Sequence, residues 1–317
     1  SPDYCSPQTY DSPARDVLYR NRGDGAFDDV TVEAGLDRAF GCGLGVVAGD
    51  FDGDQLPDFF VANDGTPSQL WINQGEGRFK DEAFYAGCAV DQDGRAKAGM
   101  GVTAGDVDAD GDLDLLVCNL ANQTDSFFLN EGGLFRDSTA SAGLGMASRP
   151  FTRFGMAWHD FDHDGFLDLY VANGDVTVGD EPADPRDPYA QVNLLFAGGA
   201  DQTFREVLPR GGTVPELVAT SRGMACGDVD GDGDVDLVVV NRNLGAHLLI
   251  NEVGARRSWV LFEVLDQRGS PAIGARVELE CGGRTQWRLV DPAYGYCSAN
   301  DVRVHFGLGD AELVERI

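Results

Sequence analysis

The stretch Asp106-Val-Asp-Ala-Asp-Gly-Asp-Leu-Asp114 decides the fold of this chain. Five carboxylates lie within nine residues, and the apolar run 115–118 follows at once. Carboxylates this close together repel one another strongly unless a cation lies between them. The alternate spacing around Gly111 lets a tight loop point the first, third and fifth aspartates inward, and the ninth closes the cage. Oxygen ligands in this number suit calcium, which takes roughly 6–8 of them, so the stretch is interpreted as a calcium loop.

The same spacing occurs three more times in the chain. The copies are Asp50-Phe-Asp-Gly-Asp-Gln-Leu-Pro-Asp58, Asp160-Phe-Asp-His-Asp-Gly-Phe-Leu-Asp168 and Asp228-Val-Asp-Gly-Asp-Gly-Asp-Val-Asp236. An EF-hand loop also opens with spaced acids, but it needs a glutamate at its twelfth position. The twelfth positions here are all valine, namely Val61, Val117, Val171 and Val239. EF-hands are therefore excluded, and we expect about four calcium ions, one in each loop.

Each loop is expected to bind calcium through five of its residues. The first, third, fifth and ninth would bind through carboxylates and the seventh through its main-chain carbonyl. The expected ligands are Asp50, Asp52, Asp54, Leu56 and Asp58; Asp106, Asp108, Asp110, Asp112 and Asp114; Asp160, Asp162, Asp164, Phe166 and Asp168; and Asp228, Asp230, Asp232, Asp234 and Asp236. The first loop carries Gln55 and Pro57 at positions where glycine and a variable residue are usual, so we expect its site to be the weakest.

Composition limits the classes of protein to which the chain can belong. Its 317 residues suffice for two domains, and a net charge of −29 argues against binding to a nucleic-acid backbone. No apolar run approaches the roughly 20 residues of a membrane span. Calcium loops of this kind fill at the calcium levels found outside cells, which predicts a secreted, extracellular or periplasmic protein. The chain contains no signal peptide, so we expect it to be a mature or excised piece whose leader lies upstream.

The segments between the loops also repeat. A Gly-rich strand precedes each loop, a continuous apolar strand follows it, and two more short strands complete the unit. Runs such as 59–62 and 237–240 do not alternate between apolar and polar residues, so both faces of these strands should be buried. Four short strands at a period of roughly fifty residues are typical of a β-propeller.

One insertion, at residues 174–191, lengthens the third repeat. It is rich in Gly, Pro and Asp, and long loops on a rigid scaffold often carry function. We expect it to be part of a recognition surface, with Val176 and Tyr189 as apolar anchors for a partner. A solvated bulge that merely covers a blade edge is the alternative.

Several motifs resemble known families. Phe154-Gly-Met, with the third loop, resembles an FG-GAP (or VCBS) repeat, the unit of integrin α-subunit propellers. The segment Leu18-Tyr-Arg-Asn-Arg-Gly-Asp-Gly-Ala-Phe27 resembles the cartilage acidic protein family and its bacterial relatives. Ala272-Ile-Gly-Ala-Arg-Val277 and Val304-His-Phe-Gly-Leu-Gly309 closely resemble the ASPIC/UnbV domain that follows the propeller in that family.

The resemblance implies an all-β chain with an integrin-α-like β-propeller followed by a small β-rich domain. The family propeller is seven-bladed, and only part of it is expected here, with further blades before Ser1. Residues 1–36 would be a partial blade and irregular lead-in, 37–255 four FG-GAP blades, and 256–317 a truncated ASPIC/UnbV-like domain. The resemblance also implies calcium in the loops and secretion.

The predicted function is adhesion or interaction with a protein or glycan at the cell surface or in the matrix. No catalytic residue and no cofactor other than calcium is predicted, because an enzyme needs one centre and not four. Two alternatives stay open: a polysaccharide-active enzyme framed by a propeller, and a self-assembling structural subunit of a surface layer or filament. A propeller enzyme should gather unlike polar residues in one central funnel.

The sequence also predicts the environments of some histidine and cysteine residues. His163 occupies a variable slot of the third loop and is predicted to be solvated. The seven cysteines include no CxxC zinc spacing. Cys118 and Cys226 are expected to be buried thiols, and Cys281 and Cys297 are candidates for a disulfide.

Overall fold

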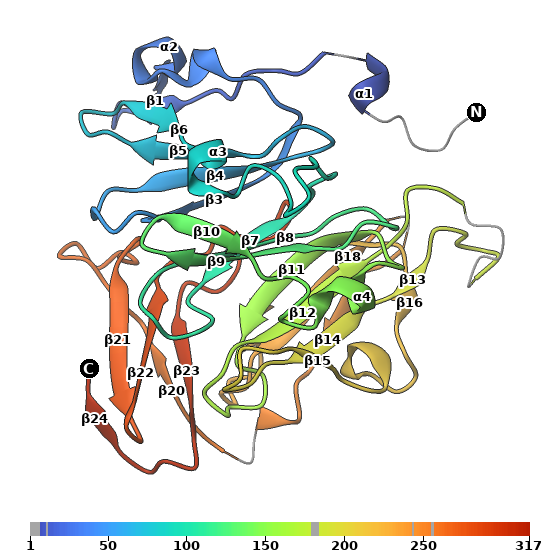
Figure 1. The fold of residues 1–317 in the computed structure, drawn as a ribbon. Coiled ribbons are helices and arrows are strands. Elements are labelled where there is room, and N and C mark those ends of the chain that lie inside the picture. Colours follow the sequence, from blue (N-terminus) through green and yellow to red (C-terminus); the bar gives the residue numbers. More distant parts are fainter. Residues whose placement is uncertain (1–6, 11, 179–183, 243, 255–256) are drawn as a thin grey trace.

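The computed structural model describes residues 7–10, 12–178, 184–242, 244–254 and 257–317, and it is all-β, as predicted (Figure 1). The helices are single turns: α1 (Pro7–Tyr10), α2 (Thr31–Ala34), α3 (Ala83–Ala86), α4 (Leu144–Ser148) and the 3₁₀ turns η1 (Leu36–Arg38) and η2 (Arg210–Gly212). Within these residues no helix has the length and apolar character needed to cross a membrane.

Four antiparallel sheets form the repeating part of the molecule. The first is β3 (Gly43–Gly49), β4 (Asp58–Asn63), β5 (Gln69–Asn73) and β6 (Phe79–Asp81). The second is β7 (Val102–Gly105), β8 (Asp114–Val117), β9 (Ser126–Glu131) and β10 (Leu134–Asp137). The third is β11 (Arg153–His159), β12 (Asp168–Asn173), β14 (Leu194–Ala197) and β15 (Arg205–Glu206), and the fourth is β17 (Ser221–Gly227), β18 (Asp236–Asn241) and β19 (His247–Leu249). Each loop that carries the aspartates joins the first two strands of its sheet, as expected from the sequence.

Shorter elements flank these sheets, which we call blades one to four. A hairpin of β1 (Tyr19–Asn21) and β2 (Phe27–Asp29) precedes blade one, and β13 (Gln191–Val192) pairs with β16 (Val218–Ala219). The C-terminal strands form two sheets: β20 (Ser258–Phe262) with β23 (Val304–Gly309), and β22 (Arg284–Leu289), β21 (Arg276–Cys281) and β24 (Val314–Arg316) in that order. Figure 1 shows these strands as a separate group beside the blades.

The first strands of the blades, β3, β7, β11 and β17, lie next to one another in that order. We call these first strands the inner strands, and glycine permits their close approach. A Cβ atom on a glycine of one inner strand would collide with a main-chain carbonyl at the next. The pairs are Gly45 with Met100, Gly101 with Phe154, and Gly155 with Arg222. The Gly-rich character of these segments thus has a physical cause, because any side chain there would push the blades apart.

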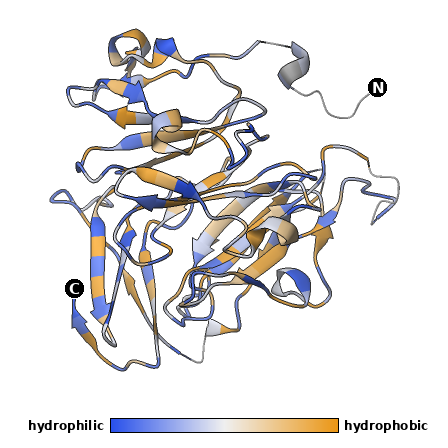
Figure 2. Ribbon diagram, viewed as in Figure 1, coloured by the Kyte–Doolittle hydropathy of each residue, from blue (hydrophilic) through white to orange (hydrophobic). Residues whose placement is uncertain are grey.

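The apolar core lies between the blades. Phe60 of blade one shares a buried cluster with Leu115 of blade two, and Leu116 on the other face of that strand shares the next cluster with Leu169 of blade three. Every residue of β8 and β12 is buried. The prediction of strands buried on both faces is therefore confirmed for β8 and β12, but it is wrong for the run 237–240 in blade four, where Val240 is exposed. Figure 2 shows the hydrophobic residues concentrated along the stacked strands.

The C-terminal region also reaches the inner strands of the blades. Residues 291–303, between β22 and β23, run along them. Val102 and Gly295 exchange both main-chain hydrogen bonds, with N···O distances of 3.2 and 2.8 Å. The main-chain N–H groups of Met224 and Cys226 donate to Ser298 Oγ (3.1 Å) and Asn300 Oδ1 (3.0 Å). The segment therefore links blade two to blade four.

Candidate metal centres

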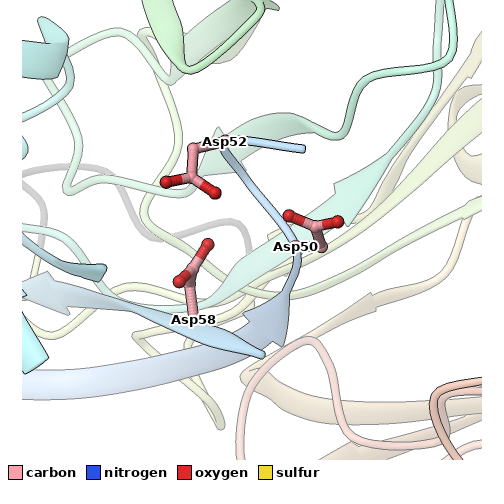
Figure 3. Close-up of side chains that lie close together, drawn as sticks. All are labelled: Asp50, Asp52 and Asp58. Carbon is pink, nitrogen blue, oxygen red and sulfur yellow. The ribbon is translucent and has the colours of Figure 1, made fainter. Parts of the chain in front are cut away.

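Three carboxylates converge in each of the four predicted loops, with candidate ligand atoms within 4.8 Å of one another. Figure 3 shows this arrangement for the first loop, whose carboxylates point toward a common space beside the β3–β4 hairpin. The groups are Asp50, Asp52 and Asp58; Asp106, Asp108 and Asp114; Asp160, Asp162 and Asp164; and Asp228, Asp230 and Asp236. The structure thus brings together the first and third residues of every loop, with the ninth in three loops and the fifth in one.

The fifth aspartates and the seventh residues shape the loop backbone. In the third loop the N–H of Asp164 donates to Asp160 Oδ1 (2.9 Å), and Asp164 Oδ1 accepts the N–H of Phe166 (2.9 Å). Asp54, Asp110 and Asp232 accept the same bond from Leu56, Asp112 and Asp234. The seventh residue therefore faces the fifth aspartate through its N–H, and its role as a carbonyl ligand stays a prediction.

The ninth aspartate holds the loop and the third strand of the blade together. Asp114 Oδ2 accepts the N–H of Val107 (2.9 Å), and its Oδ1 accepts the N–H of Asn130 (2.9 Å) on β9. The same two bonds recur at Asp58, Asp168 and Asp236, to the residue after the first aspartate and to the end of the third strand. Sequence reasoning assigned this residue to the metal alone and missed its part in joining the strands.

An asparagine at the end of the third strand ties loops to neighbouring blades. Asn130 Nδ2 donates to the carbonyl of Phe51 (3.0 Å) in the first loop, and Asn251 Nδ2 donates to the carbonyl of Phe161 (2.8 Å) in the third. The Asn that recurs at the end of the third strand in blades one, two and four is the sequence signal for this contact, and Gly198 takes its place in blade three. The loops are therefore part of the blade-to-blade packing.

Electrostatics show that these sites fit a cation. Burial, with a contribution from neighbouring carboxylates, raises the pKa of Asp58 and Asp106 to about 6, of Asp160 to about 7 and of Asp114 to about 8. In addition, Asp108 Oδ1 is buried with no hydrogen-bond partner among the residues described. Oxygen-only donor sets with several carboxylates match calcium better than zinc or copper.

His163 is not solvated, so the prediction for it was wrong. Its side chain is fully buried, its ring centroid lies 4.7 Å from that of His305, and its Nε2 lies 3.7 Å from Asp234 Oδ1. Burial lowers the pKa of His163 and brings that of His305 to about 3. The C-terminal strands and Asp234 of the fourth loop cover this side of the third loop, and a local pattern could not reveal that cover.

The candidate disulfide between Cys281 and Cys297 is not formed, since both cysteines are free thiols. Cys281 is buried in the C-terminal domain and donates to the carbonyl of Leu313 (3.3 Å), whereas Cys297 is exposed. Cys281 precedes β22 in the chain and Cys297 follows it, and the fold does not bring their sulfurs together. Cys118 and Cys226 are buried, as expected.

The 174–191 insertion packs on the protein more than the sequence suggested. Residues 179–183 lie outside the described part of the chain. Of the two proposed anchors, Val176 packs against the core between blades two and three, and the Tyr189 ring lies under the Arg242 guanidinium at 4.9 Å. Asp187 Oδ1 accepts the hydroxyl hydrogen of Thr220 (2.6 Å). These contacts tie both ends of the insertion to the blades.

Sequence reasoning missed the arginines that face the loops. Arg288 borders one cavity together with Asp106 and Asp160, the first aspartates of two loops. Arg257 Nη1 lies 2.8 Å from Asp162 Oδ1. The available signal was the concentration of arginine near the end of an otherwise acidic chain.

Comparisons with known proteins agree with these features. A family model described as FG-GAP-like repeat matches residues 2–61, 50–117 and 106–171, and one described as ASPIC and UnbV matches residues 266–317. The chain is 29% identical over 303 residues to cartilage acidic protein 1 of Xenopus tropicalis, covering 92% of this chain and 43% of the relative. The human protein of that name is 29% identical over 300 residues, covering 92% and 42%. The chain thus spans less than half the length of these relatives.

Solved structures resemble the chain only weakly. A lectin of Agrocybe aegerita that recognises non-reducing terminal N-acetylglucosamine superposes with a TM-score of 0.41 at 17% identity, covering 75% of this chain and 60% of the lectin. The V. cholerae biofilm matrix protein Bap1 gives a TM-score of 0.34 at 14% identity, covering 77% and 45%. The repeats, the C-terminal match and the curated relatives together identify the chain as a member of the family of FG-GAP-repeat proteins with an ASPIC/UnbV domain that includes cartilage acidic protein 1.

Proposed function

We propose that this chain is a calcium-binding β-propeller module that acts outside the cell by recognising a protein or glycan surface. The observation that supports it most is the gathering of three carboxylates in each of four loops, at the same place in each blade. An enzyme needs one reacting centre, whereas four similar centres in four similar blades are typical of structural metal sites.

Calcium would supply the positive charge that the carboxylates of each loop lack. The first, third, fifth and ninth aspartates would bind it together with the carbonyl of the seventh residue. The ninth would also keep its bonds to the loop and to the third strand. Because the ion binds only the folded loop, each site stabilises the fold by about 2.7 kcal/mol when calcium is a hundredfold above the dissociation constant. Rigid blades then present a fixed surface to the partner.

An extracellular location follows from the same sites. Extracellular calcium modules typically have dissociation constants of about 10⁻⁴–10⁻³ M, which only calcium outside the cytosol can fill. The net charge of −29 keeps the protein soluble and disfavours anionic partners such as nucleic acids.

Elemental analysis tests the metal part of this proposal. Protein dialysed against calcium at about 1 mM should retain about four ions per chain, and magnesium at the same concentration should not replace them. Chelation should lower the melting temperature. A calcium content near zero, or a melting curve that chelation leaves unmoved, would contradict the proposal.

Binding and catalysis are separated by a second assay. Calcium-loaded protein should bind a cell surface or an immobilised glycan and lose that binding when calcium is removed, with no change in the glycan. Release of shortened saccharides from a polysaccharide panel would instead support the enzyme alternative.

A further inference from the structure

The C-terminal domain contacts three of the four aspartate loops through arginine side chains. Arg276 Nη1 donates to the carbonyl of Gly111 (3.4 Å) in the second loop, and Arg303 Nη2 donates to that of Asp228 (3.1 Å) in the fourth. Both acceptors are main-chain oxygens, so these two arginines bind the loops without using the loop carboxylates. Arg257 differs, because its Nη1 lies 2.8 Å from Asp162 Oδ1 in the third loop.

The third loop is held most firmly. Arg284 donates from Nη2 to the carbonyl of Gly165 (2.6 Å) and from Nη1 to that of Asp164 (3.3 Å), and its guanidinium lies 3.7 Å from the centroid of the Phe166 ring. The main-chain N–H of Gly309 donates to the carbonyl of His163 (2.8 Å). Strand β23 therefore lies directly on this loop.

Glycine at position 307 shows how close that contact is. A Cβ atom on Gly307 would collide with Asp160 Oδ2, and it would lie 2.6 Å from the Cα atom of His163. The effect on the carboxylates is visible in their burial: Asp106 and Asp160 are buried, whereas Asp50 and Asp228 are only half-buried. The C-terminal domain thus closes over the second and third loops.

The first loop differs in its surroundings. Across the described parts of the chain, no hydrogen bond or ion pair connects residues 50–58 with residues 257–317. The hydrogen bond that it receives from outside blade one comes from Asn130 of blade two, which donates to the Phe51 carbonyl. Its apolar contacts reach further, because the Phe51 ring packs against Phe135 and lies in one core cluster with Trp287 of β22. The first loop can therefore serve as an internal reference for the third.

The ordering of the loop backbone physically links calcium binding to the C-terminal domain. An aspartate loop must take up one backbone conformation before it can bind calcium, and donors that fix its carbonyls reduce the entropy lost on binding. By thermodynamic reciprocity, a domain that raises calcium affinity must itself be held more firmly when calcium is bound.

We propose that the C-terminal domain is a calcium-linked clamp on the third loop, with Arg284 as its main positioning residue, so that this loop binds calcium more tightly than it would alone. The proposal rests on the calcium-binding function proposed above. It assigns no such linkage to the first loop.

Hydrogen exchange at increasing calcium tests the clamp loop by loop. Arg284→Met removes both donors but keeps an apolar stem over Phe166. Protection of amides in 160–168 should then require about tenfold more calcium, since two charged donors are lost. Protection of 50–58 should keep its wild-type midpoint. Arg316→Met is the matched control, because Arg316 lies in the same sheet and, among the described residues, its side chain bonds only to Glu278 and Glu280 of that sheet.

A readout on the wild-type protein covers the case in which Arg284→Met folds poorly. Calcium should slow exchange in β22 and β23 of the wild-type chain. Three results would overturn the clamp alone. They are an unchanged calcium midpoint for 160–168 in Arg284→Met, an equal shift of the midpoints of both loops, and exchange in the wild-type C-terminal strands that does not depend on calcium. A wild-type chain in which calcium protects no loop would overturn the proposed function, and the clamp with it.

Discussion

Asn130 on β9 donates a hydrogen bond of 3.0 Å from its side-chain amide to the carbonyl of Phe51, a residue of the first loop in the preceding blade. The same amide reaches the carbonyl of Leu113 at 3.1 Å in its own blade. One side chain therefore fixes two aspartate loops relative to each other. The conformation of the aspartate loops and the packing of the blades are therefore coupled, and several measurable effects follow.

Asn130→Ala should destabilise the protein by about 3 kcal/mol, because it leaves two buried carbonyls without a donor. Denaturant unfolding monitored by circular dichroism measures the loss. Asn73→Ala is the matched control. Asn73 holds the equivalent place in blade one, but within the described part of the chain its amide donates only to the exposed Pro57 carbonyl of its own blade. Equal losses in the two variants would argue against the link between blades.

Gly101→Ala should destabilise the chain by about 3 kcal/mol, because the new methyl group would collide with the Phe154 carbonyl on the next inner strand. Gly245→Ala provides the control, since a Cβ there meets nothing within 4 Å. Thermal unfolding compares the two variants. If Gly101→Ala and Gly245→Ala have the same melting temperature, the inner strands are not packed as closely as described.

Gln55→Gly should stabilise the first loop. Gln55 has a φ of 68°, whereas glycine occupies the corresponding left-handed positions 111, 165 and 233. Relief of left-handed strain is worth about 1 kcal/mol, and the added freedom of glycine in the unfolded chain offsets about half of it. Calcium titration of the variant should show tighter binding at the first loop. Gly53→Ala, at a φ of 81° with open space around it, should weaken the same loop.

Metal-free protein should lose stability as the pH rises from about 6.5 to about 8. The folded-state pKa values of Asp160 and Asp114 are raised to about 7 and about 8, so the folded protein holds these protons and is stabilised until the pH passes through those values. Below this window His159 and His305 oppose the trend, because burial lowers their pKa to about 4 and about 3, and stability falls as the pH drops.

Melting temperatures in metal-free and calcium-containing buffers measure this pH dependence. Calcium should abolish the fall, because it binds the ionised carboxylates. Asp114→Asn, which cannot ionise, should show a smaller fall than the wild-type chain in metal-free buffer. A metal-free protein that gains stability between pH 6.5 and 8 would show that the carboxylates are not buried against one another as described.

The sequence predicted those features that depend on local order. The spacing of Asp106 to Asp114 fixes which side chains can converge, and a hairpin between two apolar strands follows from the same stretch. Inner-strand glycines such as Gly101 were recognisable as a pattern, but their cause, contact with the next blade, needed the structure.

What the sequence could not predict depends on contacts between distant segments. His163 was predicted to be solvated because no residue near it in the sequence indicates that His305 will cover it. Arg284 lies far along the chain from Gly165, and no periodicity relates the two residues. The cysteines gave the opposite error: Cys281 and Cys297 are near in sequence, yet strand geometry separates their side chains.

The central claim is that each aspartate loop binds one calcium ion, and anomalous scattering from crystals grown with calcium tests it most directly. The account predicts one anomalous peak in each of the four groups of carboxylates, beside Asp52, Asp108, Asp162 and Asp230. Loops without peaks in crystals that contain calcium at about 1 mM or more, or peaks confined to other parts of the surface, would contradict it.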